Sequence, residues 1–184
     1  MASIITHSIA AVIFGKTLTN KVLSKKFLFY VGLFSVLPDF DVVAFLFGIP
    51  YESFWGHRGF THSFFFAFIV GLIGSAVYLR SINLKSLQFW SWTLFFFAVT
   101  STHTILDALT NGGLGVAFFS PFENSRYFFP FTPLEVSPIG FKAFFSQRGI
   151  DILINEFSWV VAPLLILFAI RKFSSKTKSK ESTK

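Results

Sequence analysis

The sequence predicts an all-α protein, a multi-pass transmembrane helical bundle with one proline-broken helix and a long irregular outer loop. Of its 184 residues, 53% are hydrophobic and only 14% are charged, whereas about a quarter of an average soluble domain is charged. The mean hydropathy is +0.63. Three uninterrupted apolar stretches are long enough to cross a hydrocarbon core of about 30 Å, which takes roughly 20 helical residues.

The individual elements follow from the apolar runs. The first run, 4–14, is too short to span a membrane upright. The second run, 27–49, is long enough but contains Pro38. Because proline removes a backbone donor and clashes with the preceding turn, this run predicts two half-helices around a bend. The three uninterrupted spans are 60–79, 89–109 and 150–170.

Basic residues fall on alternate connections between these runs. Twelve of the sixteen share this placement: Lys16, Lys21, Lys25, Lys26, Arg80, Lys85 and the six in 171–184. Since Lys and Arg are enriched in cytoplasmic loops, we expect the C-terminus in the cytoplasm and the connection 110–149 outside. We also expect one membrane-embedded domain, 1–170, followed by a basic, disordered cytoplasmic tail, 171–184.

Composition also excludes several classes of function. Without cysteine, the chain has no disulfides, no thiolate nucleophile and no cysteine-based zinc site. The net charge of +7 comes mostly from the tail. Because these basic residues are not clustered on the surface of the folded domain, we expect no nucleic-acid binding. The tail instead favours attraction to anionic membrane lipid.

Seven ionisable residues lie in or beside apolar segments. A charged group at the bilayer centre costs about 2.5–3.5 kcal/mol on insertion scales, so such residues normally have a partner and a task. With the orientation above, the segments bring these residues to a similar depth, toward the outside. The seven are His7, Asp39, Asp41, His57, His62, His103 and Asp107.

Two spacings favour a joint site. His103 and Asp107 are four residues apart, so they share one helix face and can offer a nitrogen and an oxygen to one metal ion. Asp39 and Asp41 flank Phe40 after the proline. In an extended bend, both carboxylates can therefore point the same way.

His57 and His62 are five residues apart and do not share a helix face. We expect a turn between them, with Thr61 as the N-cap of a helix that begins at His62. Each candidate also has an ordinary structural interpretation, as a satisfied core histidine, a helix-capping carboxylate or a surface loop residue. A shared metal ion would explain the whole set together.

The ligand types suggest the metal and the reaction. Imidazole and carboxylate without thiolate suit zinc first, then manganese, iron or nickel. One zinc takes about four ligands including water, so seven candidates predict two ions that share a carboxylate. Paired ions about 3.5–4 Å apart activate water in phosphoester hydrolysis. Arg58 and Arg126 are candidate phosphate clamps, or else they snorkel to the interface.

These residues lie in five motifs, and a sixth follows them in the chain: THS (6–8), LPDFD (37–41), HRGFTHS (57–63), HTILDALTNGG (103–113) and PFENSRYFFPF (121–131), then VSPIG (136–140). Through them the chain resembles the YdjM-like family of LexA-regulated, membrane-bound, metal-dependent hydrolases. It is more distantly similar to zinc-dependent phospholipases C and single-strand-specific nucleases. The resemblance implies hydrolase activity. It also implies that the same seven residues are metal ligands.

The expected function is hydrolysis of a phosphoester by a metal-activated water, and a lipid-linked phosphoester is the preferred substrate. Asp41 is the expected proton acceptor, and it forms the expected catalytic set with Arg58 and Arg126. We expect a multi-pass protein of the inner (cytoplasmic) membrane, with its site facing outward and membrane lipid and a small-molecule or lipid phosphoester as partners. Two other classes stay open. One is a proton- or metal-coupled transporter that uses the same residues as a relay, and the other is a phenylalanine-rich scaffold for membrane proteins.

Overall fold

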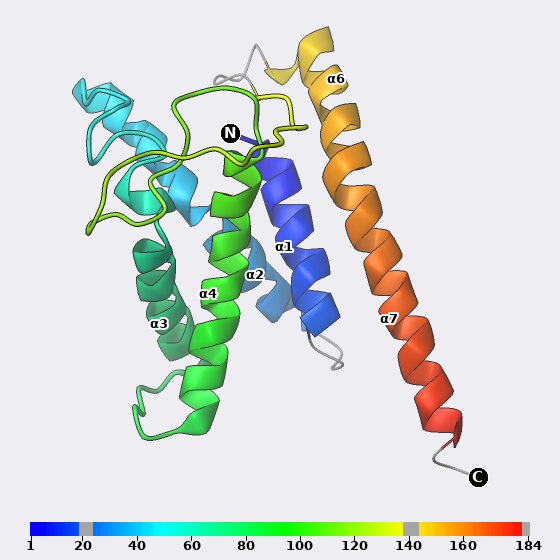
Figure 1. Cartoon of the computed structure of the whole chain (residues 1–184). Coiled ribbons are helices and arrows are strands. Elements are labelled where there is room, and N and C mark those ends of the chain that lie inside the picture. Colours follow the sequence, from blue (N-terminus) through cyan, green and yellow to red (C-terminus); the bar gives the residue numbers. More distant parts are fainter. Residues whose placement is uncertain (19–23, 138–143, 182–184) are drawn as a thin grey trace.

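The computed structural model describes residues 1–18, 24–137 and 144–181, with side chains as far as 173. The described residues form an all-helical bundle without a β-strand, as predicted (Figure 1). In chain order the helices are α1 (Ile4–Leu18), α2 (Lys25–Val36), η1 (Leu37–Phe47), η2 (Phe60–His62), α3 (Phe64–Leu79), α4 (Leu87–Ala108), α6 (Gln147–Glu156), η3 (Phe157–Val161) and α7 (Ala162–Glu181).

Serine hydroxyls begin three of these helices, each accepting from the backbone N–H three residues on: Ser24 for α2, Ser63 for α3 and Ser86 for α4. Such a cap satisfies a donor that has no partner inside the helix. Because α3 begins at Phe64, the prediction that Thr61 caps a helix starting at His62 is wrong. Thr61 lies in the short 3₁₀ turn η2, and its hydroxyl donates to Asp41 instead.

The proline break is confirmed. The α-helical hydrogen bonding of α2 ends at Val36, and the chain continues as the 3₁₀-helix η1 with Pro38 in its first turn. An eleven-residue 3₁₀ run is unusual, because these helices rarely exceed 3–4 residues. Gly48 ends it at φ 69°, a left-handed conformation that glycine adopts without a steric penalty. Two of the predicted metal ligands therefore lie on an irregular helix.

Small residues allow α3 and α4 to pack closely. A Cβ added at Gly71 would lie 2.6 Å from the carbonyl oxygen of Thr93, and one added at Gly74 would lie 2.9 Å from the ring of Phe96. The Ser75 hydroxyl also donates to the carbonyl of Phe89. Close backbone approach through small residues is typical of helix pairs in membranes. The main apolar core joins this pair to α1 and α2 through Ala11, Phe27, Val31, Phe34, Val70, Phe96 and Val99.

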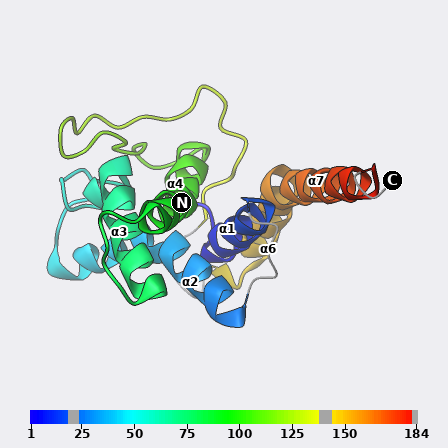
Figure 2. The ribbon, with the colours of Figure 1, turned by 90° about the horizontal axis from the view of Figure 1, so that it is seen from below.

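The last helical stretch, from α6 through the π-helical segment η3 to α7, lies to one side of the bundle and packs against α1 (Figure 2). By length and composition, two helical segments are apolar enough to cross a membrane: Lys25–Phe47 and Gln147–Phe173. They correspond to the predicted 27–49 and 150–170. The backbone of α7 runs to Glu181 and so includes most of the segment expected to be a disordered tail.

The other two predicted spans are helical as well, with shifted ends. The 22 residues of α4 measure about 33 Å at 1.5 Å per residue, enough for the hydrocarbon core. The 16 residues of α3 measure about 24 Å. The span predicted to begin at 60 is therefore shorter than expected, because the first four residues form η2 and the serine cap.

The predicted long loop lies across one end of the bundle, beside the N-terminus and the end of α4 (Figure 1). In its described part, 109–137, it is irregular apart from two isolated bridges that pair Thr110 with Leu134 and Val116 with Tyr127. Lys142 and most of the VSPIG motif lie outside the described residues. The loop therefore covers the end of the bundle at which the candidate residues gather.

Candidate metal centre

Five segments bring the seven predicted ligands to the same end of the bundle. His7 lies in the first turns of α1, Asp39 and Asp41 on η1, His57 in the following loop, His62 at the end of η2, and His103 and Asp107 in the last turns of α4. The four histidines and Asp107 are 0–1% exposed, while Asp39 is 5% and Asp41 8% exposed. The structure thus brings the seven predicted residues together at one end of the bundle.

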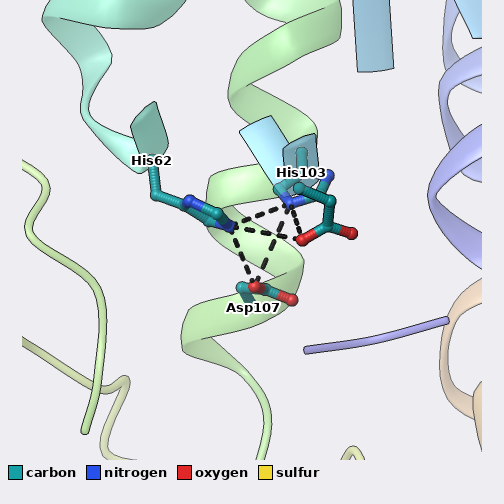
Figure 3. Close-up of side chains that lie close together, drawn as sticks. His62, His103 and Asp107 are labelled. Atoms are coloured by element: carbon teal, nitrogen blue, oxygen red, sulfur yellow. Dashed lines mark hydrogen bonds and ion pairs between the residues drawn. The ribbon is translucent and has the colours of Figure 1, made fainter. Parts of the chain in front are cut away.

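Four side chains form the central group of the site: Asp39, His62, His103 and Asp107. Each offers one ligand atom, and these atoms lie within 4.8 Å of one another. Figure 3 shows His62, His103 and Asp107 pointing toward one another. The Nε2 atoms of the two histidines are 3.1 Å apart, and the Nε2 of His62 lies 3.4 Å from Oδ2 of Asp107. Oδ1 of Asp39 lies 3.3 Å from Nε2 of His103.

These separations suit the ligands of one ion. Tetrahedral zinc with metal–nitrogen bonds of about 2.0–2.1 Å places its ligand atoms roughly 3.3–3.4 Å apart. The separation between Nε2 of His103 and Oδ2 of Asp107 is 4.0 Å, and all the ligand atoms of the central group lie within 4.8 Å of one another. Two nitrogens and two carboxylate oxygens are a donor set that zinc or manganese accepts. The residues present therefore fit a divalent metal.

Hydrogen bonds on the far side of each ring assign its proton. The carbonyl oxygen of Ser35 can only accept, so Nδ1 of His103, 2.8 Å away, carries a hydrogen. Nδ1 of His62 lies 3.0 Å from a carboxylate oxygen of Asp41 and donates to it. In the neutral rings both Nε2 atoms are then unprotonated. Two lone pairs that face each other at 3.1 Å repel unless a proton or a metal ion lies between them.

A second group shares His62 with the first and adds Asp41 and His57. Nδ1 of His57 lies 2.6 Å from Oδ1 of Asp41, while the Thr61 hydroxyl donates to Oδ2 at 2.6 Å and the backbone N–H of Arg58 at 3.2 Å. Asp41 therefore accepts from four donors, whereas neither oxygen of Asp39 has a hydrogen-bond partner. Burial lowers the pKa of His57, although its hydrogen bond to Asp41 acts in the opposite direction.

His7 lies against the central group. Its ring stacks on His103 with 3.7 Å between centroids, and its Nε2 lies 3.3 Å from Oδ1 of Asp107. The same Oδ1 accepts from the backbone N–H of Ala2 at 2.8 Å. His7 thus approaches the oxygen of Asp107 that faces away from the other central ligands.

Arg58, a predicted phosphate clamp, is fully buried. Its Nε lies 3.1 Å from Oδ2 of Asp107, and its two terminal nitrogens donate to the carbonyl of Gly112 and the hydroxyl of Thr110. A Cβ at Gly113 would lie 3.0 Å from the guanidinium. The structure therefore places Arg58 as a support of Asp107 and not as a free cation above the site.

Arg126, the other predicted clamp, holds the loop around His57. Its guanidinium donates to the carbonyls of His57 and Tyr51 at 2.8 and 2.9 Å, and to that of Ser53 at 3.2 Å. It also lies over the Tyr51 ring, 5.5 Å from the centroid. Burial lowers the pKa of this guanidinium. Arg126 fixes the backbone that carries His57.

One buried carboxylate was not among the predicted site residues. Glu156, at the end of α6, is fully buried and accepts from the backbone N–H and hydroxyl of Ser3, both at 2.5 Å, and from the hydroxyl of Thr6 at 2.7 Å. It therefore fixes the turn that precedes His7. A glutamate within an apolar span was the available signal. Ser35 could not be found from sequence, because its backbone carbonyl makes the contact.

The charged side chains in contact around the site carry a net negative charge. Asp39, Asp41 and Asp107 lie beside one guanidinium, that of Arg58, which pairs with Asp107, and each of the four residues is 8% exposed or less. Buried charges are stable when they are paired or coordinate a metal. The excess negative charge therefore favours a bound divalent cation.

The comparisons with known proteins agree with a membrane location. The family model of the YdjM inner membrane protein matches residues 1–179. The chain is also similar to the inner membrane protein YbcI of Escherichia coli (strain K12), with 34% identity over 170 residues that cover 92% of this chain and 96% of that protein. No solved structure matches the chain significantly.

Proposed function

The chain belongs to the YdjM inner membrane protein family. We propose that it is a membrane-embedded, metal-dependent hydrolase that acts on a phosphoester, with a lipid-linked phosphoester as the preferred substrate. The single observation that carries the metal requirement is the central group. There, two imidazole nitrogens and two carboxylate oxygens converge within 4.8 Å. In an apolar protein, a bound cation offsets the repulsion between the two carboxylates.

A divalent ion bound there would act as a Lewis acid on a phosphoryl oxygen and lower the pKa of a water molecule. The central residues hold the ion, with zinc as the first choice and manganese as the second. Asp41 was the expected proton acceptor, but it accepts from four donors of the chain. Arg58 and Arg126 are likewise engaged by the chain, so we assign these three residues to positioning.

The surface next to the least buried ligands supports a lipid-linked substrate. Asp39 and Asp41 are the ligand candidates with some exposure, and both lie on η1. The same helix exposes large apolar side chains: 61% of Phe40, 84% of Leu46 and 77% of Phe47. A substrate with a hydrocarbon part can cover this surface while its phosphate approaches the carboxylates.

We further propose a multi-pass arrangement in the inner (cytoplasmic) membrane, with the site toward the outer side and the C-terminus in the cytoplasm. Five described basic residues of the connections lie at the end of the bundle away from the site: Lys16, Lys25, Lys26, Arg80 and Lys85 (Figure 1). At the site end, Arg58 and Arg126 are bound by the chain itself, and Arg148 on α6 is exposed. The positive-inside rule favours this orientation.

The test is elemental analysis of detergent-purified protein, followed by hydrolysis of bis(p-nitrophenyl) phosphate and of phospholipid vesicles. Wild type is expected to retain zinc or manganese, and His103→Ala and Asp107→Asn are expected to lose both metal and activity. Asp151→Asn is the matched control, because Asp151 is an exposed carboxylate on α6. Metal-free wild type, or full metal content in both variants, would overturn the proposal.

A transporter is the second candidate, favoured by one observation. The α-helical backbone of α2 gives way to 3₁₀ geometry at Pro38, and two carboxylates follow directly. Broken helices of this kind form ion sites in transporters. Zinc flux into proteoliposomes separates the two functions, because a hydrolase retains its ion and shows no flux.

A further inference from the structure

We propose that the centre holds one divalent ion, bound by Asp39, His62, His103 and Asp107, and that Asp41 and His57 form a hydrogen-bonded support and not a second metal site. The inference rests on the proposed function for the presence of a metal. It goes further by dividing the seven candidate residues into ligands and positioning residues, and it replaces the two ions expected from the ligand count.

The first argument is that both carboxylate oxygens of Asp41 are already in contact with polar groups of the chain. Its two oxygens accept from the ring of His57, the ring of His62, the Thr61 hydroxyl and a backbone N–H, all between 2.6 and 3.2 Å. A cation placed among these hydrogens would have to displace them. His62 would also have to lose its Nδ1 proton while its Nε2 serves the first ion. Asp39, by contrast, has two oxygens without a hydrogen-bond partner.

The second argument is that the other three ligands are each held from behind. Asp41 accepts from the far nitrogen of His62, and the Ser35 carbonyl accepts from that of His103. The backbone N–H of Ala2 holds the far oxygen of Asp107, Oδ1, while Nε of Arg58 lies 3.1 Å from its Oδ2. Ligating histidines commonly donate their second N–H to a carboxylate or carbonyl, which fixes the tautomer and the ring orientation. Asp41 and His62 have this arrangement.

The third argument is charge. Counting side chains alone, the three carboxylates of the site and the guanidinium of Arg58 leave two negative charges in a buried region. One divalent ion neutralises them. A second ion would add two more positive charges, and the other buried carboxylate nearby, Glu156, is already bound by Ser3 and Thr6, so that excess is costly in an apolar environment.

His7 belongs with the support. Its Nε2 lies 3.3 Å from Oδ1 of Asp107, and Ala2 already donates to that oxygen. His7 is not part of either ligand group, and its ring stacks on His103. It therefore packs behind two of the ligands.

The test measures zinc stoichiometry and affinity in the full chain, by elemental analysis and by titration against a competing chelator. Wild type is expected to bind one ion per chain. His57→Gln is expected to keep that ion, while Asp39→Asn and His62→Gln lose it. Removal of a support typically weakens metal affinity about 10–100-fold. Asp41→Asn, which keeps an acceptor for His62, should therefore bind more tightly than Asp41→Ala, and thermal unfolding of the metal-free variants separates this effect from misfolding.

Wild type also provides a test that needs no substitution. Manganese-loaded protein at full occupancy is expected to give the six-line electron paramagnetic resonance spectrum of an isolated ion. Two ions per chain, a coupled spectrum, or a fall from two ions to one in His57→Gln would overturn the single-ion assignment and leave the proposed function intact. Wild type without metal would overturn the proposed function itself.

Discussion

Asp107 is the residue at which the buried charges of the site meet. Its Oδ2 lies 3.1 Å from Nε of Arg58 and 3.4 Å from Nε2 of His62, while its Oδ1 accepts from the backbone N–H of Ala2. All four residues are fully buried. In the metal-free protein, the guanidinium thus supplies a permanent positive charge beside this carboxylate.

Arg58→Met is therefore expected to lower the free energy of unfolding of the metal-free protein by about 3–5 kcal/mol, because it leaves a buried carboxylate without its partner. Thermal unfolding in detergent with a chelator measures this loss. Arg148→Met, at an exposed position on α6, is the control and should stay within about 0.5 kcal/mol of wild type. Equal effects of the two changes would show that Asp107 does not depend on Arg58.

For individual residues, the sequence predicted which side chains gather at the site but not which groups each of them contacts. The four-residue spacing of His103 and Asp107 placed both residues in the central group, since a helix fixes their relative position. The roles expected of Arg58 and Arg126 were phosphate binding, yet their partners are backbone carbonyls, a hydroxyl and a carboxylate from distant segments. Such contacts depend on the path of irregular loops, which no periodicity encodes.

Among the elements, the α3–α4 pair sets the spacing on which the site depends, because α4 carries two central ligands and the segment before α3 carries a third. Gly71 permits this close packing. Gly71→Ala would place a methyl group 2.6 Å from the Thr93 carbonyl oxygen. We expect it to lower the free energy of unfolding by about 1–3 kcal/mol, the usual cost of overpacking.

Gly32→Ala is the matched control, because Gly32 lies within α2 and an added Cβ meets nothing within 4 Å. It should stabilise the helix by about 0.4–1 kcal/mol, since alanine loses less conformational entropy on folding. Chemical denaturation in mixed micelles measures both variants. If Gly71→Ala left the free energy of unfolding unchanged, α3 and α4 could move apart without loss of stability, contrary to this prediction.

The helices themselves were largely predictable, because apolar runs and a proline are local signals. The break at Pro38 and the span 150–170 were predicted correctly. The start of α3 was not, because the hydroxyls of Thr61 and Ser63 compete for the capping role, and tertiary contact with Asp41 recruits the first. The 3₁₀ geometry of η1 was not predicted, because 3₁₀ runs rarely exceed 3–4 residues and this one has eleven.

For the whole molecule, the central question is orientation in the membrane, and a chain without cysteine is a suitable background for labelling. Glu52→Cys places a thiol at an exposed position in the site-end loop, and Asn83→Cys places one in the connection between α3 and α4. In intact spheroplasts, a membrane-impermeant maleimide is expected to label the first variant. The second should react only after the membrane is opened. The reverse pattern would invert the proposed topology.

Glu156 lies in the last helical stretch, yet its carboxylate binds Ser3 and Thr6, which precede it by 153 and 150 residues in the chain. Because translation runs from the N-terminus, α1 is synthesised before this acceptor exists. The first turn of α1 can make these contacts only after α6 has been synthesised. Delivery of the ion by the cell is therefore expected to be a late step of biogenesis that follows completion of the polypeptide.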